Sequence, residues 1–295
     1  MQHFIFHQEI RDYQNWLQAL NYSKSTIYYN PKFISWFLGF VVKEGVSSLE
    51  EITKSHTIQY YEYLTERSHQ RQTKPLSPSY IGNQLNALRN YGSYVQKTKQ
   101  ISLPLSIVHI ASEEKKINVL TRSEITQLYQ SCAATVLGLR DRAMLSIYYG
   151  CGLRRNEGIQ LKLKDIDFTE GKLTVQCGKG GKRRTLPFNE IIAEDLKSYL
   201  QYSRPFLYPA TDHLLVSSWG NPCSYNLMIR RLQLLVKQSK ISQDKKVGLH
   251  TLRHSIATHL YQAQMPLEHI QQFLGHSSLQ STQIYTHVES GITTL

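Results

Sequence analysis

Six side chains in the second half of the sequence are of types that could act together on a phosphate ester. They are two arginines, one lysine, two histidines and one tyrosine: Arg154, Lys179, His250, Arg253, His276 and Tyr285. A guanidinium can fork two phosphate oxygens and keeps its charge at any working pH. A lysine can protonate a leaving oxygen, and a histidine can donate a hydrogen bond or accept a proton. The residue types therefore favour a site that stabilises negative charge on a phosphate.

The spacing of these residues places several of them on common surfaces. His250 and Arg253 stand at i and i+3 on one expected helix, so both can face one phosphate. Arg154 follows Gly152 and Leu153 at an expected helix boundary. Glu157, three residues later on the same helical face, could orient Arg154 without itself touching the phosphate. His254 is interpreted as a structural or supporting residue.

Tyr285 lies nine residues after His276. A phenol has a pKa of about 10 and is a poor nucleophile at neutral pH unless cations surround its target. A neutral His250 could take its proton. Taken singly, each pattern also fits an ordinary role, such as a surface arginine, a solvated turn or a packed aromatic ring. The joint order of the six residues is what favours a site.

The clearest strand signal surrounds Lys179. Residues 172–177 alternate in polarity, Gly178-Lys-Gly-Gly181 can turn, and residues 182–188 return, which predicts a β-hairpin with a lysine at its tip. Three cations follow the tip and could hold neighbouring phosphates: Lys182, Arg183 and Arg184. A basic hairpin is also compatible with a plain solvated turn.

Two segments carry a resemblance to a known family. They are His250-Thr-Leu-Arg-His-Ser-Ile-Ala-Thr-His-Leu260 and Leu274-Gly-His-Ser-Ser-Leu-Gln-Ser-Thr-Gln-Ile-Tyr285-Thr-His-Val288. Together with Arg154 and Lys179 they resemble the catalytic set of the tyrosine recombinases, the phage-integrase and Xer-like family. The resemblance covers residues 119–288 well and the N-terminal part in outline.

The resemblance implies site-specific DNA recombination, of the Xer type or as the integrase of a mobile element. It implies that Tyr285 attacks a phosphodiester to form a 3′-phosphotyrosyl bond, with Lys179 protonating the leaving 5′-hydroxyl. Arg154, Arg253, His250 and His276 would stabilise the transition state. The implied partners are double-stranded DNA and three further protomers in a tetramer on DNA, alone or with a second recombinase. No cofactor, metal or nucleotide is implied, and the sequence contains no ATP-binding loop motif.

The remaining pattern predicts the elements that position these residues. Apolar periodicity predicts helices over 5–20, 23–42, 57–66 and 79–95, then 122–132, 138–149, 190–201, 225–240, 250–262, 266–273 and 279–288. The fold class expected is mainly α, with an N-terminal helical bundle of the SAM-like core-binding type and an α+β catalytic domain holding a small antiparallel sheet. The expected boundaries are 1–100 for the DNA-binding domain, 101–118 for a linker and 119–295 for the catalytic domain.

Composition supports a polyanionic partner. The formal net charge is +12, with +4 in residues 1–110 and +8 in residues 111–295, so a long contact surface is favoured over a basic tail. Four scattered cysteines without a C-x-x-C pair suit a reducing cytoplasm and disfavour a zinc site. No signal peptide or membrane span is recognised.

Three other functions stay open at this point. A type IB topoisomerase shares the chemistry but relaxes DNA as a monomer, and a DNA-binding protein of the same fold would lack activity. A metalloenzyme could use His250, His254 and His276. Only ten residues follow Tyr285, so the C-terminal helix that relatives dock on a neighbouring protomer is expected to be very short.

Overall fold

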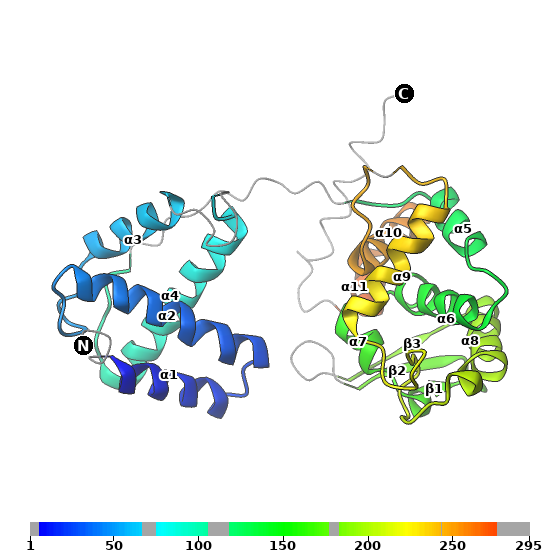
Figure 1. The fold of residues 1–295 in the computed structure, drawn as a ribbon, viewed down its shortest axis with the longest axis horizontal. Coiled ribbons are helices and arrows are strands. Elements are labelled where there is room, and N and C mark those ends of the chain that lie inside the picture. Colours follow the sequence, from blue (N-terminus) through cyan, green and yellow to red (C-terminus); the bar gives the residue numbers. More distant parts are fainter. Residues whose placement is uncertain (1–5, 67–74, 106–117, 177–182, 243, 276–295) are drawn as a thin grey trace. The chain divides into compact units, whose positions relative to one another are not determined.

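The computed structural model describes residues 6–66, 75–105, 118–176, 183–242 and 244–275. The chain divides into two compact units, Met1–Lys115 and Lys116–Leu295 (Figure 1). Each unit has its own apolar core. The two units are therefore described one at a time.

The first unit is a bundle of helices whose starts follow local capping chemistry. Ser23 and Ser77 each accept a hydrogen bond from the backbone N–H three residues later, which pairs one orphan donor at each helix start. The helix that begins after Ser23 continues through Pro31. The helices in this unit are α1 (His7–Ala19), α2 (Lys24–Lys43), α3 (Lys54–Glu66) and α4 (Pro78–Lys99).

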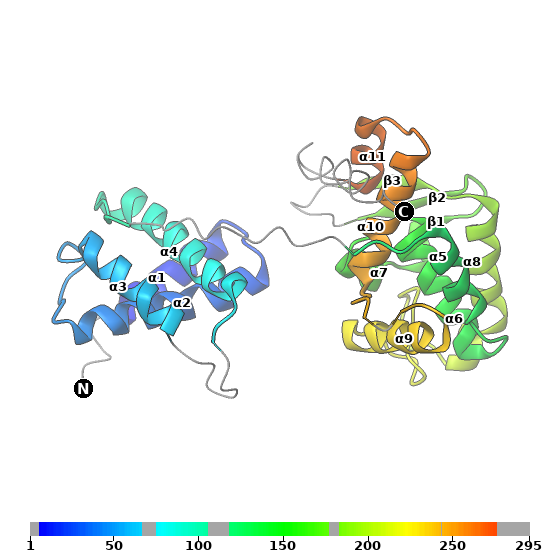
Figure 2. The ribbon, with the colours of Figure 1, turned by 90° about the horizontal axis from the view of Figure 1, so that it is seen from above.

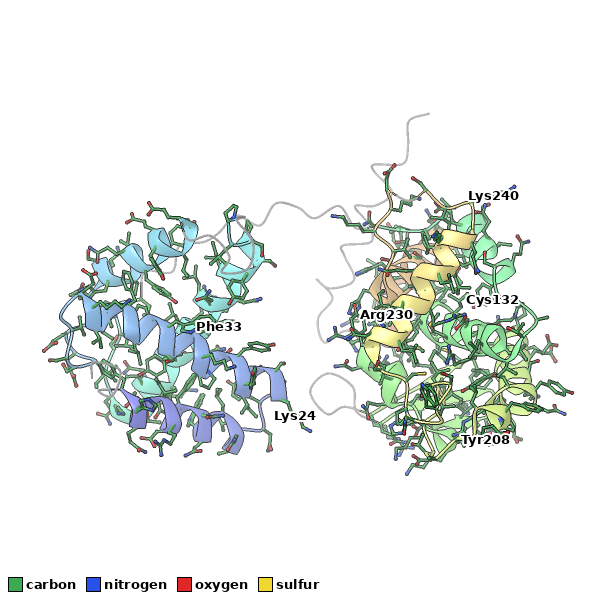
Figure 3. All side chains as sticks on the ribbon, viewed as in Figure 1. Lys24, Phe33, Cys132, Tyr208, Arg230 and Lys240 are labelled. Atoms are coloured by element: carbon green, nitrogen blue, oxygen red, sulfur yellow. The ribbon has the colours of Figure 1, made fainter. Side chains whose placement is uncertain are left out.

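Aromatic rings fill much of the core of the first unit. Tyr13 of α1 meets Tyr91 of α4 edge-on, with ring centroids 5.2 Å apart. Phe33 of α2, which is labelled in Figure 3, meets Tyr80 of α4 in the same way at 5.7 Å. Such edge-to-face pairs stabilise the core beyond the contribution of the apolar area that each ring buries. Tyr13, Tyr60, Tyr91 and Tyr94 are therefore core residues of this unit.

The second unit is mostly helical. Figure 2 shows α10 in the middle of the unit, with α9 on one side and α11 on the other. A capping box between Thr121 and Glu124 starts the first helix of the unit. The helices are α5 (Arg122–Gln130), α6 (Val136–Leu145), α7 (Arg155–Gln160), α8 (Glu190–Tyr202), α9 (Tyr225–Gln238), α10 (Leu249–Gln262) and α11 (Leu267–Leu274).

One small antiparallel sheet lies beside α8 (Figure 1). Its strands are β1 (Ile166–Asp167), β2 (Lys172–Val175) and β3 (Arg184–Pro187), in the order β1-β2-β3. Leu173 pairs with Leu186 and Val175 with Arg184, and Leu173, Val175 and Leu186 are buried. Both strands of the expected hairpin are thus present, and the tip of the hairpin lies outside the described residues. The predicted fold class, mainly helical with one small antiparallel sheet, is confirmed.

Several elements of the structure differ from those that the sequence periodicity predicted. The helix expected over 138–149 ends at Leu145 and continues as one π-helical turn, Ser146–Gly150, because Cys151 N–H bonds five residues back to Ser146 O at 3.0 Å. Leu103, inside the expected linker, packs in the core of the first unit. The helix expected over 279–288 lies outside the described residues. Within the described helices, none is long and apolar enough to cross a membrane.

Candidate active site

Arg154 is positioned by the turn that precedes α7. Gly152 adopts a left-handed φ of 58°, which glycine tolerates best, and Leu153 is fully buried. Arg154 then takes the N-cap position of α7 with extended backbone angles, and its N–H donates to Glu157 Oε2 at 2.8 Å. The buried leucine and this bond hold the arginine at the start of the helix.

Glu157 is the centre of a cluster of three arginines. Its side chain is 3 % exposed and accepts from Arg154 Nη1 at 2.9 Å. Arg184 of β3 approaches with both ends of its guanidinium, Nη1 to Oε1 at 2.8 Å and Nη2 to Oε2 at 2.7 Å. Arg253 Nη1 of α10 lies 3.9 Å from Oε2. The cluster joins residues that are far apart in the sequence.

The charge state of Glu157 follows from these contacts. Burial alone would raise the pKa of its carboxyl, but hydrogen bonds from Arg184 and from the Arg154 N–H outweigh burial and lower the pKa to about 2. Glu157 is therefore a carboxylate at neutral pH and neutralises one of the three guanidinium charges. Two positive charges remain in excess at this point.

Arg253 is held by backbone carbonyls. It is almost fully buried, and it donates from Nη1 to Gly152 O at 2.5 Å and from Nη2 to Leu274 O at 2.7 Å. Arg154 Nη2 donates to Gly275 O at 2.6 Å. The two arginines thus bind the carbonyls that end α11, where Gly275 has a left-handed φ of 65°. His276 is the next residue in the sequence.

His250 and His254 of α10 are neutral at pH 7. Partial desolvation and the charges of Arg253, Arg155 and Arg154 lower the pKa of the exposed His250. Burial, with His250 and Arg253 nearby, lowers the pKa of His254 to about 4. A neutral imidazole beside arginines can accept a proton, which an imidazolium cannot.

The structure brings together part of the set that the sequence predicted. Arg154, Arg253 and His250 converge on the cluster around Glu157, and His254 lies one turn further along α10. Arg183 is exposed at the end of the hairpin. Four of the predicted residues lie outside the described residues: Lys179, Lys182, His276 and Tyr285. Their positions and roles stay predictions.

The sequence interpretation did not anticipate what Arg184 contacts. It placed this arginine with the cations that hold DNA, whereas both Nη atoms bind buried Glu157. Strand alternation contained a signal, because Arg184 and Leu186 lie two residues apart and share one face of β3. Leu186 faces the core, so an arginine on the same face needs a buried acid as partner.

Among the described residues, no group of three or more His, Cys, Asp or Glu side chains could hold a metal ion. The metal site considered from the sequence also needs His276, which lies outside the described residues. That arrangement therefore stays a hypothesis.

Removing the Glu157 charge should change how stability depends on pH. The folded-state pKa of about 2 lies below the ordinary value of 4.5. Ionised Glu157 therefore stabilises the fold above pH 4.5, and this contribution is lost as pH falls towards 2. In urea unfolding, the gap between wild type and Glu157→Gln should be constant above about pH 5 and shrink by about 1.4 kcal/mol per pH unit below about 4.5. A gap that stays unchanged down to about pH 3 would contradict this.

Comparison with known proteins decides the family. Residues 118–291 match the sequence model of the phage integrase family, which is more than half of the chain. The chain is 34% identical over 275 residues to the tyrosine recombinase XerC of Bacillus subtilis (strain 168), covering 91% of this chain and 87% of the relative. The chain belongs to the phage integrase family of tyrosine recombinases. The family, the enzyme class and the recombination activity expected from the sequence are thereby confirmed.

Other relatives of this recombinase agree. The tyrosine recombinase XerD of Halalkalibacterium halodurans is 33% identical over 249 residues, covering 82% of this chain and 80% of the relative. A crystal structure of the XerH site-specific recombinase bound to a palindromic difH substrate, a post-cleavage complex, aligns with a TM-score of 0.67 at 26% identity. That alignment covers 89% of this chain and 75% of XerH. The Tn1549 transposon integrase aligns with a TM-score of 0.70 at 18% identity over 94% of this chain and 93% of the integrase, and it supports the fold alone.

Proposed function

We propose that this recombinase cuts and rejoins DNA strands through a covalent bond between Tyr285 and the 3′ phosphate of the cut strand. The observation that carries the proposal is the convergence of Arg154 and Arg253, with His250 beside them, on one buried carboxylate. Two arginines from separate elements are held at one point with excess positive charge. That is the arrangement that a phosphate with growing negative charge requires.

Pre-organisation supports the role of the arginines. Bonds to carbonyls at Gly152, Leu274 and Gly275 fix both guanidinium groups before any substrate arrives. Groups that are already oriented need no rearrangement as charge develops on the phosphate oxygens. Arg154 and Arg253 would therefore bind the non-bridging oxygens, and His276 would add a hydrogen bond.

The proposed step balances without an added reactant. Tyr285 Oη forms a bond to phosphorus as the bond from phosphorus to the 5′ oxygen breaks. His250, neutral at pH 7, accepts the phenolic proton, and Lys179 gives a proton to the 5′ oxygen. Attack by a 5′-hydroxyl of a partner strand reverses the step, so the energy of the original ester is conserved and no ATP is consumed.

Double-stranded DNA is the proposed substrate and partner. The net charge of +12 favours a polyanion, and counterion release makes such binding weaken as salt rises. The XerH structure is a complex with its difH substrate, and the Tn1549 integrase structure is a complex with transposon right-end DNA. We assign residues 1–100 as a core-binding domain and residues 119–295 as the catalytic domain.

Exchange between two duplexes involves four strand ends, so we propose that four protomers act on the DNA, alone or with a second recombinase. We place the reaction in the cytoplasm. Cys132, Cys151 and Cys223 are all free, as reducing conditions require.

The test is a nicked duplex that traps the covalent intermediate, built on a sequence that the protein selects from fragmented genomic DNA. Wild-type protein should remain on this DNA in denaturing detergent, because the short nicked fragment is lost and cannot be rejoined. Bound substrate without any such adduct would overturn the proposal. Relaxation of plasmids regardless of sequence, with no strand exchange, would indicate a topoisomerase instead.

A further inference from the structure

Arg184 differs from its neighbour Arg183 in being enclosed. Its side chain is 13 % exposed and its Nε is buried, whereas Arg183 beside it is exposed. Both of its Nη atoms are engaged with the Glu157 carboxylate at 2.7–2.8 Å. A guanidinium in this position faces the protein interior and has little surface to offer to DNA.

The far side of Arg184 lies against the end of α11. A methyl group placed on Gly275 would come within 2.7 Å of Arg184 Cδ and 2.9 Å of Nε, so only glycine leaves room for this side chain. The carbonyl of the same Gly275 accepts from Arg154. Arg184 is thus packed between the carboxylate that binds Arg154 and the residue whose carbonyl binds Arg154.

Arg184 also joins the hairpin to the arginine cluster. Val175 and Arg184 form the last register pair described between β2 and β3, and Lys179 follows Val175 by four residues in the sequence. Glu157 is reached from α7, β3 and α10 by Arg154, Arg184 and Arg253. One ion pair therefore connects the strand pair that leads to Lys179 with the two arginines of the proposed site.

Arg184 is also the main counter-charge of the Glu157 carboxylate. Arg184 makes two short hydrogen bonds to Glu157, Arg154 makes one from its side chain, and Arg253 stays 3.9 Å away. The carboxylate is thus compensated mainly by Arg184. Without Arg184, the buried carboxylate would draw its compensation from Arg154 and Arg253, since an unpaired buried charge is costly.

We propose that Arg184 is a positioning residue for strand cleavage, which satisfies Glu157 so that Arg154 and Arg253 keep their charge and orientation for the phosphate. The proposal rests on the function proposed above for Arg154 and Arg253. It replaces the role that the sequence suggested for Arg184, a direct contact to DNA.

The experiment compares Arg184→Gln, Arg184→Lys, Glu157→Gln and the double variant Arg184→Gln/Glu157→Gln on the nicked trapping duplex. Single-turnover adduct formation at saturating protein measures the chemical step, and Kd at several salt concentrations measures binding. Arg184→Gln should slow adduct formation by about 100-fold, as expected for reacting groups displaced by about an ångström. Its Kd and salt slope should stay close to those of wild type.

Two variants separate this mechanism from simple structural damage. The double variant should react faster than Arg184→Gln alone, because the carboxylate that would compete for Arg154 and Arg253 is gone. Arg184→Lys should recover part of the rate, since the charge returns without the bidentate fork. A double variant as slow as, or slower than, Arg184→Gln overturns the proposal. The double variant leaves no unpaired buried carboxylate, and rates are compared per folded protein, with the folded fraction of each variant taken from thermal melting.

Arg183→Gln is the control for a cation that contacts DNA directly, because Arg183 is exposed. If Arg184 touched DNA directly, Arg184→Gln would weaken binding and lower the salt slope by about one phosphate contact, with normal chemistry at saturation. That pattern is expected at Arg183, and its appearance at Arg184 overturns the positioning role. Wild-type protein that forms no adduct overturns the proposed function itself. Wild-type activity with an unaffected Arg184→Gln overturns only the inference about Arg184.

Discussion

Tyr285→Phe should form no covalent adduct with the nicked trapping duplex, although it should bind that DNA about as tightly as wild type does. The substitution removes the only oxygen on the side chain that could bond to phosphorus, and it keeps the aromatic ring. Arg154, Arg253 and His250 are left in place to hold the phosphate. Gel electrophoresis in denaturing detergent, next to a native binding assay, measures both properties on one DNA.

A tyrosine of α10 provides the control. Tyr261 of α10 is half-buried and packs against the small cluster of Ala257, Ile270 and Leu274. Tyr261→Phe keeps that packing and should still form the adduct. An adduct that persists in Tyr285→Phe would show that another residue is the nucleophile.

Arg253→Lys is the substitution of a charged residue with the largest expected effect. Arg253 uses two nitrogens of one rigid fork, one toward Gly152 O and one toward Leu274 O. A lysine has a single nitrogen on a flexible stem and cannot hold both carbonyls and a phosphate in this geometry. Cleavage should fall by at least about 100-fold, the usual effect of losing one pre-organised donor to a transition-state oxyanion. Binding should be largely retained.

Arg155→Lys is the matched control for that change. Arg155 is exposed, and its guanidinium lies over the ring of Tyr225 at 4.6 Å. A lysine there keeps a cation over the ring, so cleavage should change little. Equal losses in Arg155→Lys and Arg253→Lys would mean that the loss of cleavage is not specific to the geometry of Arg253.

Most helices and the two long strands could be predicted from local pattern. Ser23 and the capping box at Thr121 start helices, and such caps depend only on residues within one turn. The alternation at Leu173, Val175 and Leu186 identified the hairpin strands and their buried face. The π-helical turn at 146–150 had no such local signal. Backbone N–H groups of Cys151 and Leu153 donate to Ser146 O and Ile147 O in this segment, and sequence periodicity does not report such bonds.

The sequence proposed members of a candidate site but not the contacts among them, and Lys179, His276 and Tyr285 lie outside the described residues. Arg154, His250 and Arg253 were identified from their order and spacing, and they lie together around Glu157. Arg184 was assigned to DNA because a basic hairpin usually faces solvent. Its partner lies 27 residues earlier on another element, beyond the reach of any local pattern.

By itself, the sequence determined which residue types could act on a phosphodiester, in which order they stand, and which family the chain resembles. These properties depend on side-chain chemistry and local periodicity. Only the tertiary structure decided which arginine binds Glu157 most closely and which carbonyls orient Arg154 and Arg253. Those contacts join α7, β3, α10 and the end of α11, and their energies depend on burial and distance between segments that meet only when the chain folds.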